Sequence, residues 1–362
     1  MVKQVALGAT FVICAAAVAS LQRAPDAGGS LTSVEGIRVG HITLTERPTG
    51  CTVVTVDGEG AVGGVSQRGA APGTRETDLL DPLNMVEKVN GIALSGGSAY
   101  GLDTAQGVMR FLEEQRIGFP IGGGVVPIVP AAVIFDLGFG NRPEIRPTAD
   151  CGYRAAMAAT TAPVIEGNVG AGAGATVGKL GGRGTATGVR RTPMKAGVGS
   201  AAIRLDSGLV VAALAVVNAV GDVVDPATGR IVAGIRNADG SLADARKLIR
   251  SGATSSTRPG ENTTLAVVAT NARLQKSQVG RVALMADDGL ARAIYPSHTL
   301  GDGDTVFALA TGRWAGSADV TTIGALAADV LSEAIVRAAT SAASSGGLAS
   351  ARDTGSIPDR LK

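Results

Sequence analysis

A threonine stands where a polar loop runs directly into an apolar strand, in the segment Gly260-Glu261-Asn262-Thr263-Thr264. The hydroxyl of Thr263 can attack the carbonyl carbon of Asn262, which converts the peptide bond into an ester that water then hydrolyses. The freed α-amine of Thr263, with a reference pKa of about 8, can act as a general base for its own hydroxyl. The junction therefore predicts a hydrolase that cuts its own chain before Thr263. A structural interpretation stays open, because threonine is common in strands.

Few other side chains in this sequence could carry nucleophilic or metal chemistry. The histidines are His41 and His298, and the cysteines are Cys14, Cys51 and Cys151. The sequence has no CxxC pair and neither histidine lies close to a cysteine, so we expect no metal site and no cofactor. Two cysteines outside the N-terminal stretch are too few for a disulfide framework. We expect Cys51 and Cys151 to be buried free thiols, with a single disulfide as the alternative.

Lys179 follows a glycine-rich run within residues 167–187. A phosphate-binding P-loop needs glycine where Ala173 stands and serine or threonine where Leu180 follows the lysine, so the pattern fails twice. A short Gly-x-Gly-x-x-Ala match in the same segment has no acidic residue at the end of a clear second strand. We therefore predict no nucleotide site, and Lys179 taken alone is typical of a solvated loop.

Other polar positions have structural as well as chemical interpretations. Asn218 ends an apolar run, where asparagine often forms a turn, and Asp302-Gly303-Asp304 is also typical of a turn. Ser98 does not fit the nucleophile elbow, because Tyr100 stands where the second glycine belongs; we predict that Ser98 caps a helix. His298 is interpreted as a structural histidine, with assistance to the acidic pair as the alternative.

Seven segments spread over roughly residues 34 to 340 carry a resemblance to a known family: Gly36–His41, Arg68–Asp78, Leu94–Leu102, Gly172–Lys179, Val216–Asn218, Asn262–Thr264 and Asp302–Thr305. In this order they resemble the L-aminopeptidase/D-esterases, which include β-peptidyl aminopeptidases and nylon-oligomer endohydrolases. The resemblance implies an αββα four-layer sandwich similar to the N-terminal nucleophile hydrolases but with a different strand topology. It also implies an α chain ending at Asn262 and a β chain from Thr263, which assemble into a homo-oligomer.

The resemblance also implies roles for five side chains. Thr263 would be the nucleophile, Lys179 would tune its proton affinity, and Asn218 would donate its amide to the oxyanion. Asp302 and Asp304 would orient the new amine and the hydroxyl. This acidic pair resembles the nylon-oligomer branch, since aminopeptidase members tend to have serine and glutamate there.

One position departs from the family pattern. Many members carry a tyrosine in the substrate pocket where this sequence has Phe135. Phenylalanine offers no donor, so the substrate range is not transferred with the resemblance. Tyr100 is expected to pack in the fold or to line the pocket.

The implied function is hydrolysis of peptide N-terminal residues or of small amides and esters. Two alternatives remain. Ornithine acetyltransferases resemble this family in fold, also cleave before a threonine, and pass the acyl group to an amine. A non-catalytic binding protein could keep the same fold.

Hydrophobic periodicity indicates the elements that would position these residues. Apolar runs predict strands at 37–44, 51–56, 208–218, 263–270 and 304–310. Helical spacing predicts helices at 99–114, 150–160, 279–294 and 323–340. Buried strands covered by amphipathic helices indicate a layered fold of the α+β or α/β class.

The chain organisation follows from composition. Residues 1–19 have the lysine, apolar run and small-x-small pattern of a signal peptide, which predicts an extracytoplasmic protein. An uncleaved membrane anchor, or a misassigned start and a cytoplasmic protein, are the alternatives. Residues 20–33 are expected to be a linker, 34–340 one domain, and 341–362 a flexible tail. The net charge is +2 without a basic stripe, so we expect no nucleic-acid partner.

Overall fold

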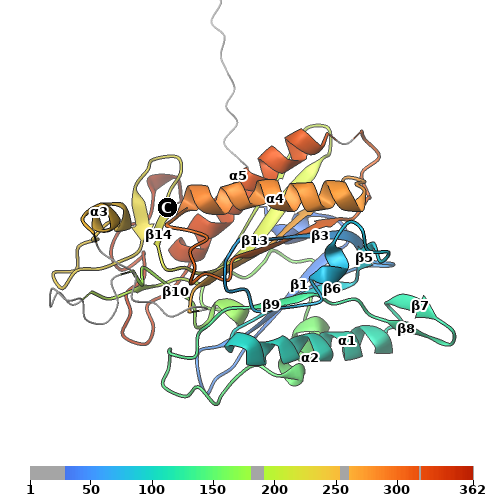
Figure 1. Cartoon of the computed structure of the whole chain (residues 1–362), viewed down its shortest axis with the longest axis horizontal. Coiled ribbons are helices and arrows are strands. Elements are labelled where there is room, and N and C mark those ends of the chain that lie inside the picture. Colours follow the sequence, from blue (N-terminus) through green and yellow to red (C-terminus); the bar gives the residue numbers. More distant parts are fainter. Residues whose placement is uncertain (1–28, 181–190, 253–260, 318, 362) are drawn as a thin grey trace, which may run out of the picture.

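The protein folds into four layers, with two β-sheets face to face and a pair of helices on the outer face of each (Figure 1). The structure is a computed structural model that describes residues 29–180, 191–252, 261–317 and 319–361. One outer layer consists of α4 (Lys276–Ala293) and α5 (Val320–Thr340), and the other of α1 (Thr104–Glu114) and α2 (Ala149–Met157). The predicted αββα sandwich is confirmed.

The six-stranded sheet under α4 and α5 has the order β12-β13-β16-β18-β3-β5. Its strands are β12 (Val198–Arg204), β13 (Val210–Asn218), β16 (Thr263–Thr270), β18 (Thr305–Ala310), β3 (Ala61–Gln67) and β5 (Lys88–Val89). The pair β16–β18 is parallel, and the other neighbouring pairs are antiparallel.

The five-stranded sheet over α1 and α2 has the order β1-β2-β6-β9-β4. Its strands are β1 (Ile37–Thr43), β2 (Gly50–Val56), β6 (Gly91–Ser95), β9 (Ala131–Val133) and β4 (Thr74–Arg75). Smaller elements are β7 (Phe119–Ile121), β8 (Gly124–Val126), β10 (Thr176–Val177), β11 (Met194–Lys195), β14 (Asp222–Val224), β15 (Ile231–Ala233), β17 (Ile294–Tyr295) and α3 (Ala245–Arg250). Short 3₁₀ turns lie at Leu31–Ser33, Asp78–Leu80, Ser98–Asp103, Gly170–Gly172 and Asp359–Leu361.

The core has three apolar layers, one between the sheets and one under each helix pair. Strand β16 shows how the sequence builds two of them, because successive side chains point to opposite faces. Leu265 and Val267 pack between the sheets, whereas Ala266 and Val268 pack under the helices. A strand buried on both faces needs a continuous apolar run, and this is the run that the sequence displays.

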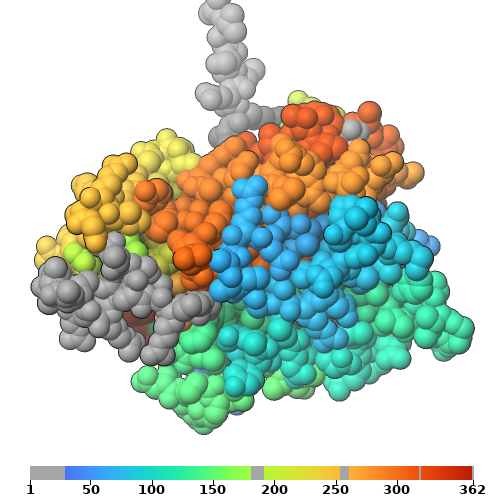
Figure 2. All heavy atoms as spheres, viewed as in Figure 1, coloured from blue at the N-terminus to red at the C-terminus, as the bar shows by residue number. Residues whose placement is uncertain are grey.

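Small residues let helix and sheet approach closely. A Cβ on Gly199 in β12 would lie 2.2 Å from the carbonyl oxygen of Ala334 in α5. The high glycine and alanine content therefore serves backbone packing in the six-stranded sheet and its helices. In the space-filling view, the orange atoms in the range of α4 lie directly against blue atoms of the N-terminal part of the chain, in agreement with the contact between α4 and β3 (Figure 2).

The structure corrects several element assignments. Strands β3 and β12 were not predicted. The sequence of β3 is AVGGVSQ, and its two adjacent glycines are unusual inside a strand and typical of a turn. Ser98 does not cap α1, since Ser98–Asp103 forms a 3₁₀ turn and α1 begins after Asp103. Ser98 also has a positive φ of 55°, whereas an N-cap residue typically has extended backbone.

Cys51 and Cys151 form a disulfide, so the expectation of two free thiols was wrong. Cys51 lies in β2 and Cys151 in α2, which packs on that strand and brings the two Cα atoms within 6.2 Å. The two cysteines are 100 positions apart in the sequence. Their pairing therefore depends on the packing of α2 against its sheet and could not be inferred from their spacing.

We expect loss of this disulfide to lower the free energy of unfolding by about 2 to 4 kcal/mol, because the bond closes a long loop in the unfolded chain. Urea unfolding of Cys151→Ala against wild type measures the effect. Mass spectrometry of unreduced, denatured and alkylated protein is the direct check. Alkylation of both Cys51 and Cys151 in that sample would contradict the pairing.

The segments outside the predicted domain are packed against it where the structure describes them. Leu31 is fully buried and its N–H donates to Ser200 Oγ at 2.8 Å. Near the C-terminus Ser350 is fully buried, and Arg360 pairs with Asp225 at 2.7 Å. The described part of the tail therefore has polar contacts with the domain. The predicted signal peptide and residues 20–28 lie outside the described residues, among which no helix is long and apolar enough to span a membrane.

Candidate active site

The predicted site residues meet at one edge of the six-stranded sheet. Asn218 ends β13 and pairs in register with Thr263, which begins β16. Because β13 and β16 are antiparallel and β16 and β18 are parallel, the end of β13 and the starts of β16 and β18 share this edge. Asp302 and Asp304 lie just before β18. Asn262, just before β16, forms an isolated parallel β-bridge with Asp302. The topology thus assembles residues that are far apart in the sequence.

The carbonyl group of Asn262 is contacted by two hydrogen-bond donors. Thr263 Oγ1 donates to the Asn262 oxygen at 2.5 Å, and the backbone N–H of Gly303 donates to the same oxygen at 2.8 Å. Asn262 is fully buried and Thr263 is 3 % exposed. The hydroxyl therefore lies against the peptide bond that precedes it, in a water-poor environment where such donors act strongly.

Lys179 reaches this edge from the glycine-rich loop. Its Nζ donates to Asn218 Oδ1 at 2.8 Å, to the Asn218 carbonyl at 3.0 Å and to the Glu261 carbonyl at 3.2 Å. Burial of the amino group lowers the pKa of Lys179 to about 7, although Asp302 opposes the shift. With this pKa, the amine of Lys179 can change protonation near neutral pH.

The residue before Lys179 must be small. Gly178 has a φ of 79°, and a Cβ on it would lie 2.1 Å from the carbonyl carbon of Gly234.

The side-chain amide of Asn218 is fixed at both ends. Its Oδ1 accepts one hydrogen bond from the backbone N–H of Thr176 at 3.1 Å and another from Lys179 Nζ. Its Nδ2 donates to the carbonyl oxygens of Phe135 at 3.0 Å and Glu261 at 3.5 Å. The donor of this amide is therefore aimed at the space between the sheets, beside the nucleophile.

The acidic pair holds the backbone around the nucleophile. Asp304 Oδ1 accepts the N–H of Thr264 at 2.7 Å, and Asp302 Oδ2 accepts the N–H of Thr299 at 2.7 Å. Burial and the neighbouring Asp304 raise the pKa of Asp302 to about 6, against the hydrogen bond from Thr299. Asp302 Oδ1 has no hydrogen-bond partner among the residues that the structure describes. This oxygen can accept a proton or a new donor.

His298 belongs to the same polar cluster. The backbone N–H of His298 donates to Asp304 Oδ2 at 3.0 Å, and the ring Nδ1 of His298 lies 3.0 Å from the same oxygen. Burial lowers the pKa of His298, but Asp304 and Asp287 outweigh it and raise the pKa above its ordinary value. Ser66 in turn donates to Asp287. Proximity in sequence to Asp302 was the only signal for this contact.

The two residues predicted to bind substrate differ in position. Phe135 contributes its carbonyl group to Asn218, and its neighbour Asp136 forms a fully buried ion pair with Arg47 at 2.9 Å. This pair was not predicted, because Arg47 lies in a segment typical of a turn. Tyr100 is 60 % exposed, and the guanidinium of Arg146 lies 3.7 Å from the centre of its ring, so this contact is at the surface.

A second buried lysine was missed by sequence reasoning. Lys195 Nζ donates to the carbonyl oxygens of Ala173 at 3.1 Å and Ala175 at 2.6 Å, and burial lowers its pKa to about 7. It thereby holds the glycine-rich loop that carries Lys179. Nothing in the sequence around residue 195 distinguishes it from a surface lysine.

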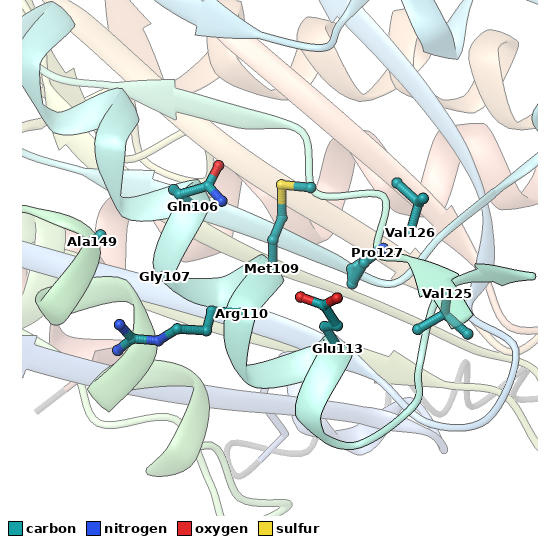
Figure 3. Close-up of a pocket in the computed structure, with 9 residues that line it drawn as sticks. All are labelled: Gln106, Gly107, Met109, Arg110, Glu113, Val125, Val126, Pro127 and Ala149. Atoms are coloured by element: carbon teal, nitrogen blue, oxygen red, sulfur yellow. The ribbon is translucent and has the colours of Figure 1, made fainter. Parts of the chain in front are cut away.

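A surface pocket of about 310 Å³ lies elsewhere, between α1 and the β7–β8 hairpin (Figure 3). Met109, Arg110 and Glu113 line it from the helix, and Val125 and Val126 line it from the hairpin. None of the predicted site residues lines this pocket. Within the described ranges, no group of three or more histidine, cysteine, aspartate or glutamate side chains could hold a metal ion.

Comparison with known proteins identifies the family. The model of peptidase family S58 matches residues 29–352. The chain belongs to this family. A Mycobacterium tuberculosis protein named as an uncharacterized aminopeptidase is 45% identical over 351 residues, covering 90% of this chain and 97% of its own. The 6-aminohexanoate-oligomer endohydrolase of Kocuria sp. is 30% identical, covering 84% of each chain.

Solved structures share the fold of this S58 peptidase. A β-aminopeptidase from Burkholderia sp. superposes with a TM-score of 0.68 at 22% identity, over 93% of this chain and 94% of its own. The L-aminopeptidase D-Ala-esterase/amidase of Ochrobactrum anthropi has a TM-score of 0.65 at 18% identity, over 91% and 92%. The Ochrobactrum anthropi enzyme has a variant of the Ntn hydrolase fold. The protein is thus a peptide or amide hydrolase with an Ntn-type fold, as the resemblance implied.

Proposed function

We propose that Thr263 is the nucleophile of this hydrolase and that it first cuts the bond between Asn262 and Thr263. One observation carries the proposal. The Thr263 hydroxyl lies 2.5 Å from the oxygen of the preceding carbonyl, and the N–H of Gly303 contacts the same oxygen. A hydroxyl in contact with a polarised carbonyl group at the start of a buried strand supports attack on the carbon of that group.

The self-cleavage conserves atoms and charge. Thr263 Oγ bonds to the carbonyl carbon of Asn262, and the carbonyl electron pair moves to the oxygen. Collapse of this intermediate breaks the C–N bond, and the proton lost by the hydroxyl ends on the Thr263 nitrogen. Water then hydrolyses the ester: its oxygen ends in the new carboxylate of Asn262, one of its protons restores the Thr263 hydroxyl, and the other passes to the new α-amine or to solvent.

The same residues can perform turnover. The freed amine of Thr263 takes the hydroxyl proton as general base, and the shifted pKa of Lys179 lets this lysine tune that proton affinity. Asn218 Nδ2 is the donor for the substrate oxyanion, whereas Asp302 and Asp304 orient the amine and hydroxyl. We propose peptides with a free N-terminus, or small amides and esters such as 6-aminohexanoate oligomers, as substrates.

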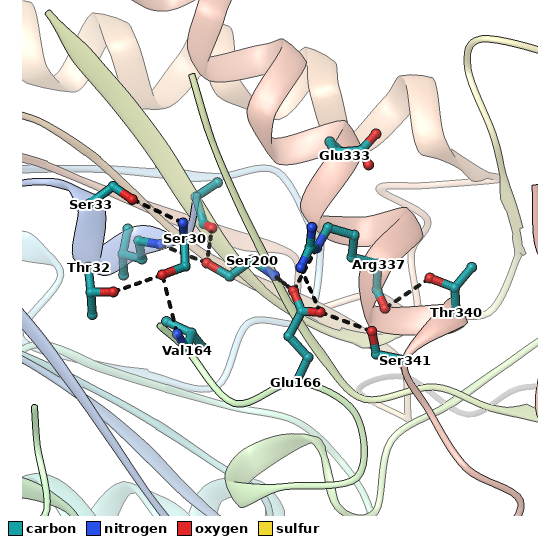
Figure 4. A network of polar contacts seen from close by, with 12 residues as sticks. Ser30, Thr32, Ser33, Val164, Glu166, Ser200, Glu333, Arg337, Thr340 and Ser341 are labelled. Atoms are coloured by element: carbon teal, nitrogen blue, oxygen red, sulfur yellow. Dashed lines mark hydrogen bonds and ion pairs between the residues drawn. The ribbon is translucent and has the colours of Figure 1, made fainter. Parts of the chain in front are cut away.

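Contacts across the cut would hold the two chains together. Glu166 in the α chain pairs with Arg337 in α5 of the β chain at 2.8 Å and also accepts from Ser341 Oγ at 3.0 Å (Figure 4). Strand β16 also remains inserted between β13 and β18. We further propose that the cleaved protomers assemble into a homo-oligomer and that residues 1–19 direct export.

Hydrolysis, rather than acyl transfer, is the expected reaction. Incubation with aminoacyl p-nitroanilides and 6-aminohexanoate oligomers should give free acids as the main products. Added ornithine or another primary amine should leave the product distribution nearly unchanged. Chromatography coupled to mass spectrometry checks this result. Predominant amide formation with the added amine would support an acyltransferase instead, and no turnover of any probe would support a binding protein.

A further inference from the structure

Two consecutive carbonyl groups of the uncut chain are held by two different sets of donors. The Asn262 oxygen accepts from the Gly303 N–H at 2.8 Å and from Thr263 Oγ1. The Glu261 oxygen accepts from Lys179 Nζ at 3.2 Å and from Asn218 Nδ2 at 3.5 Å. The donor proposed for the substrate oxyanion is therefore directed at the carbonyl before the scissile one.

We propose that self-cleavage and turnover use separate oxyanion sites: the Gly303 N–H serves self-cleavage, and Asn218 with Lys179 serves turnover. The Glu261 carbonyl occupies the second site in the uncut chain and vacates it when the end of the α chain moves away. This inference rests on the proposed function and assigns the donors of its two reactions.

The backbone turn at Gly303 is built to present its N–H. A Cβ on this residue would lie 2.7 Å from Thr263 Oγ1 and 2.8 Å from the carbonyl oxygen of Ala71, so only glycine fits without displacement. On either side, the carboxylates of Asp302 and Asp304 anchor the turn to Thr299 and Thr264. A donor held this way needs no rearrangement as charge develops.

The chemistry of self-cleavage requires a donor other than the hydroxyl. When Thr263 Oγ attacks, it gives up its proton, and its hydrogen bond to the Asn262 oxygen is lost. The negative charge then forms on that oxygen, where the Gly303 N–H remains in contact. In turnover the acyl group comes from another molecule, so its oxygen can enter the site that the Glu261 carbonyl has left.

The two sites predict a split between the two reactions. Asn218→Asp keeps an acceptor for Lys179 and should still cut the chain at about the wild-type rate. Asn218→Asp and Asn218→Ala should both hydrolyse an aminoacyl p-nitroanilide or 6-aminohexanoate oligomer about 100- to 1,000-fold more slowly. Gly303→Ala keeps the N–H, but its Cβ would lie 2.7 Å from Thr263 Oγ1 and 2.8 Å from the Ala71 oxygen, so the turn must move. Because this movement takes the N–H out of position on the Asn262 oxygen, self-cleavage should slow by about 100-fold or more. Gly138→Ala is the control, since a Cβ there meets no atom within 4 Å.

Self-cleavage is followed on denaturing gels during cell-free synthesis, and turnover is measured on the processed protein, with folding checked by circular dichroism. Folded Asn218→Asp protein whose cleavage is slowed as much as its turnover would overturn the inference. Cleavage of Gly303→Ala at the wild-type rate would also overturn it. A wild-type chain that stays whole would instead remove the proposed function, so the two failures are distinguishable.

Discussion

Thr263→Ala is expected to leave the chain in one piece and to lower amide hydrolysis by at least about a thousandfold, because the variant lacks the nucleophile of both reactions. The substitution removes only a hydroxyl and a methyl group at the start of a buried strand, so the fold should persist. Denaturing gel electrophoresis and an assay with an aminoacyl p-nitroanilide measure the two effects.

Two variants control for the position. Thr263→Ser keeps a hydroxyl and should still cut itself. Thr264→Val changes the adjacent threonine, whose fully buried hydroxyl has no partner among the described residues. Its side chain points to the opposite face of β16, so cleavage and turnover should persist. Cleavage before residue 263 in Thr263→Ala would refute the assignment of the nucleophile.

Lys179→Met is expected to slow both self-cleavage and turnover, by about 100-fold or more. Methionine has a similar length, but it removes the charged amine near Asp302 that tunes the proton affinity of Thr263 in both reactions. It also removes one donor of the oxyanion site for turnover. Time courses of cleavage, and kcat of the processed fraction, measure the loss. Normal rates in this variant would remove Lys179 from the site.

The same variant should show a pH signature in stability. The pKa of Lys179 is lowered to about 7 in the fold from an ordinary value of 10.5. The unfolded chain therefore binds more protons between these values, so the cost of burying the charge is full below pH 7 and disappears as the pH rises toward 10.5. In a Thr263→Ala background, which keeps one chain, Lys179→Met should gain stability relative to lysine at pH 6 and lose that advantage by pH 10. Urea unfolding at the two values decides; a pH-independent difference would contradict the shifted pKa.

The sequence predicted those features that depend on local pattern. The apolar runs of β13 and β16 located Asn218 and Thr263 at strand ends, and the polar-to-apolar junction located the hydroxyl. The roles of Lys179, Asp302 and Asp304 came from the family resemblance alone. The structure shows why they meet, since parallel and antiparallel pairing brings the three strand ends to one edge.

Other features depend on tertiary packing and had no local signal. The Cys51–Cys151 bond exists because α2 lies on β2. Arg47 and Lys195 resemble surface cations in the sequence, yet both side chains are buried. Their charged groups donate to carbonyl oxygens, and Arg47 also pairs with a buried carboxylate. Strand β3 was hidden by glycines such as Gly64, which is required where α4 crosses it, because a Cβ there would lie 2.7 Å from the Gly280 nitrogen.

Intact-mass analysis of purified, active protein, combined with N-terminal sequencing of its smaller component, tests whether the chain is cut before Thr263. We expect two chains, the smaller one beginning Thr-Thr-Leu-Ala-Val at Thr263. An active protein that consists of one unbroken chain, or a cut at any other bond, would contradict it.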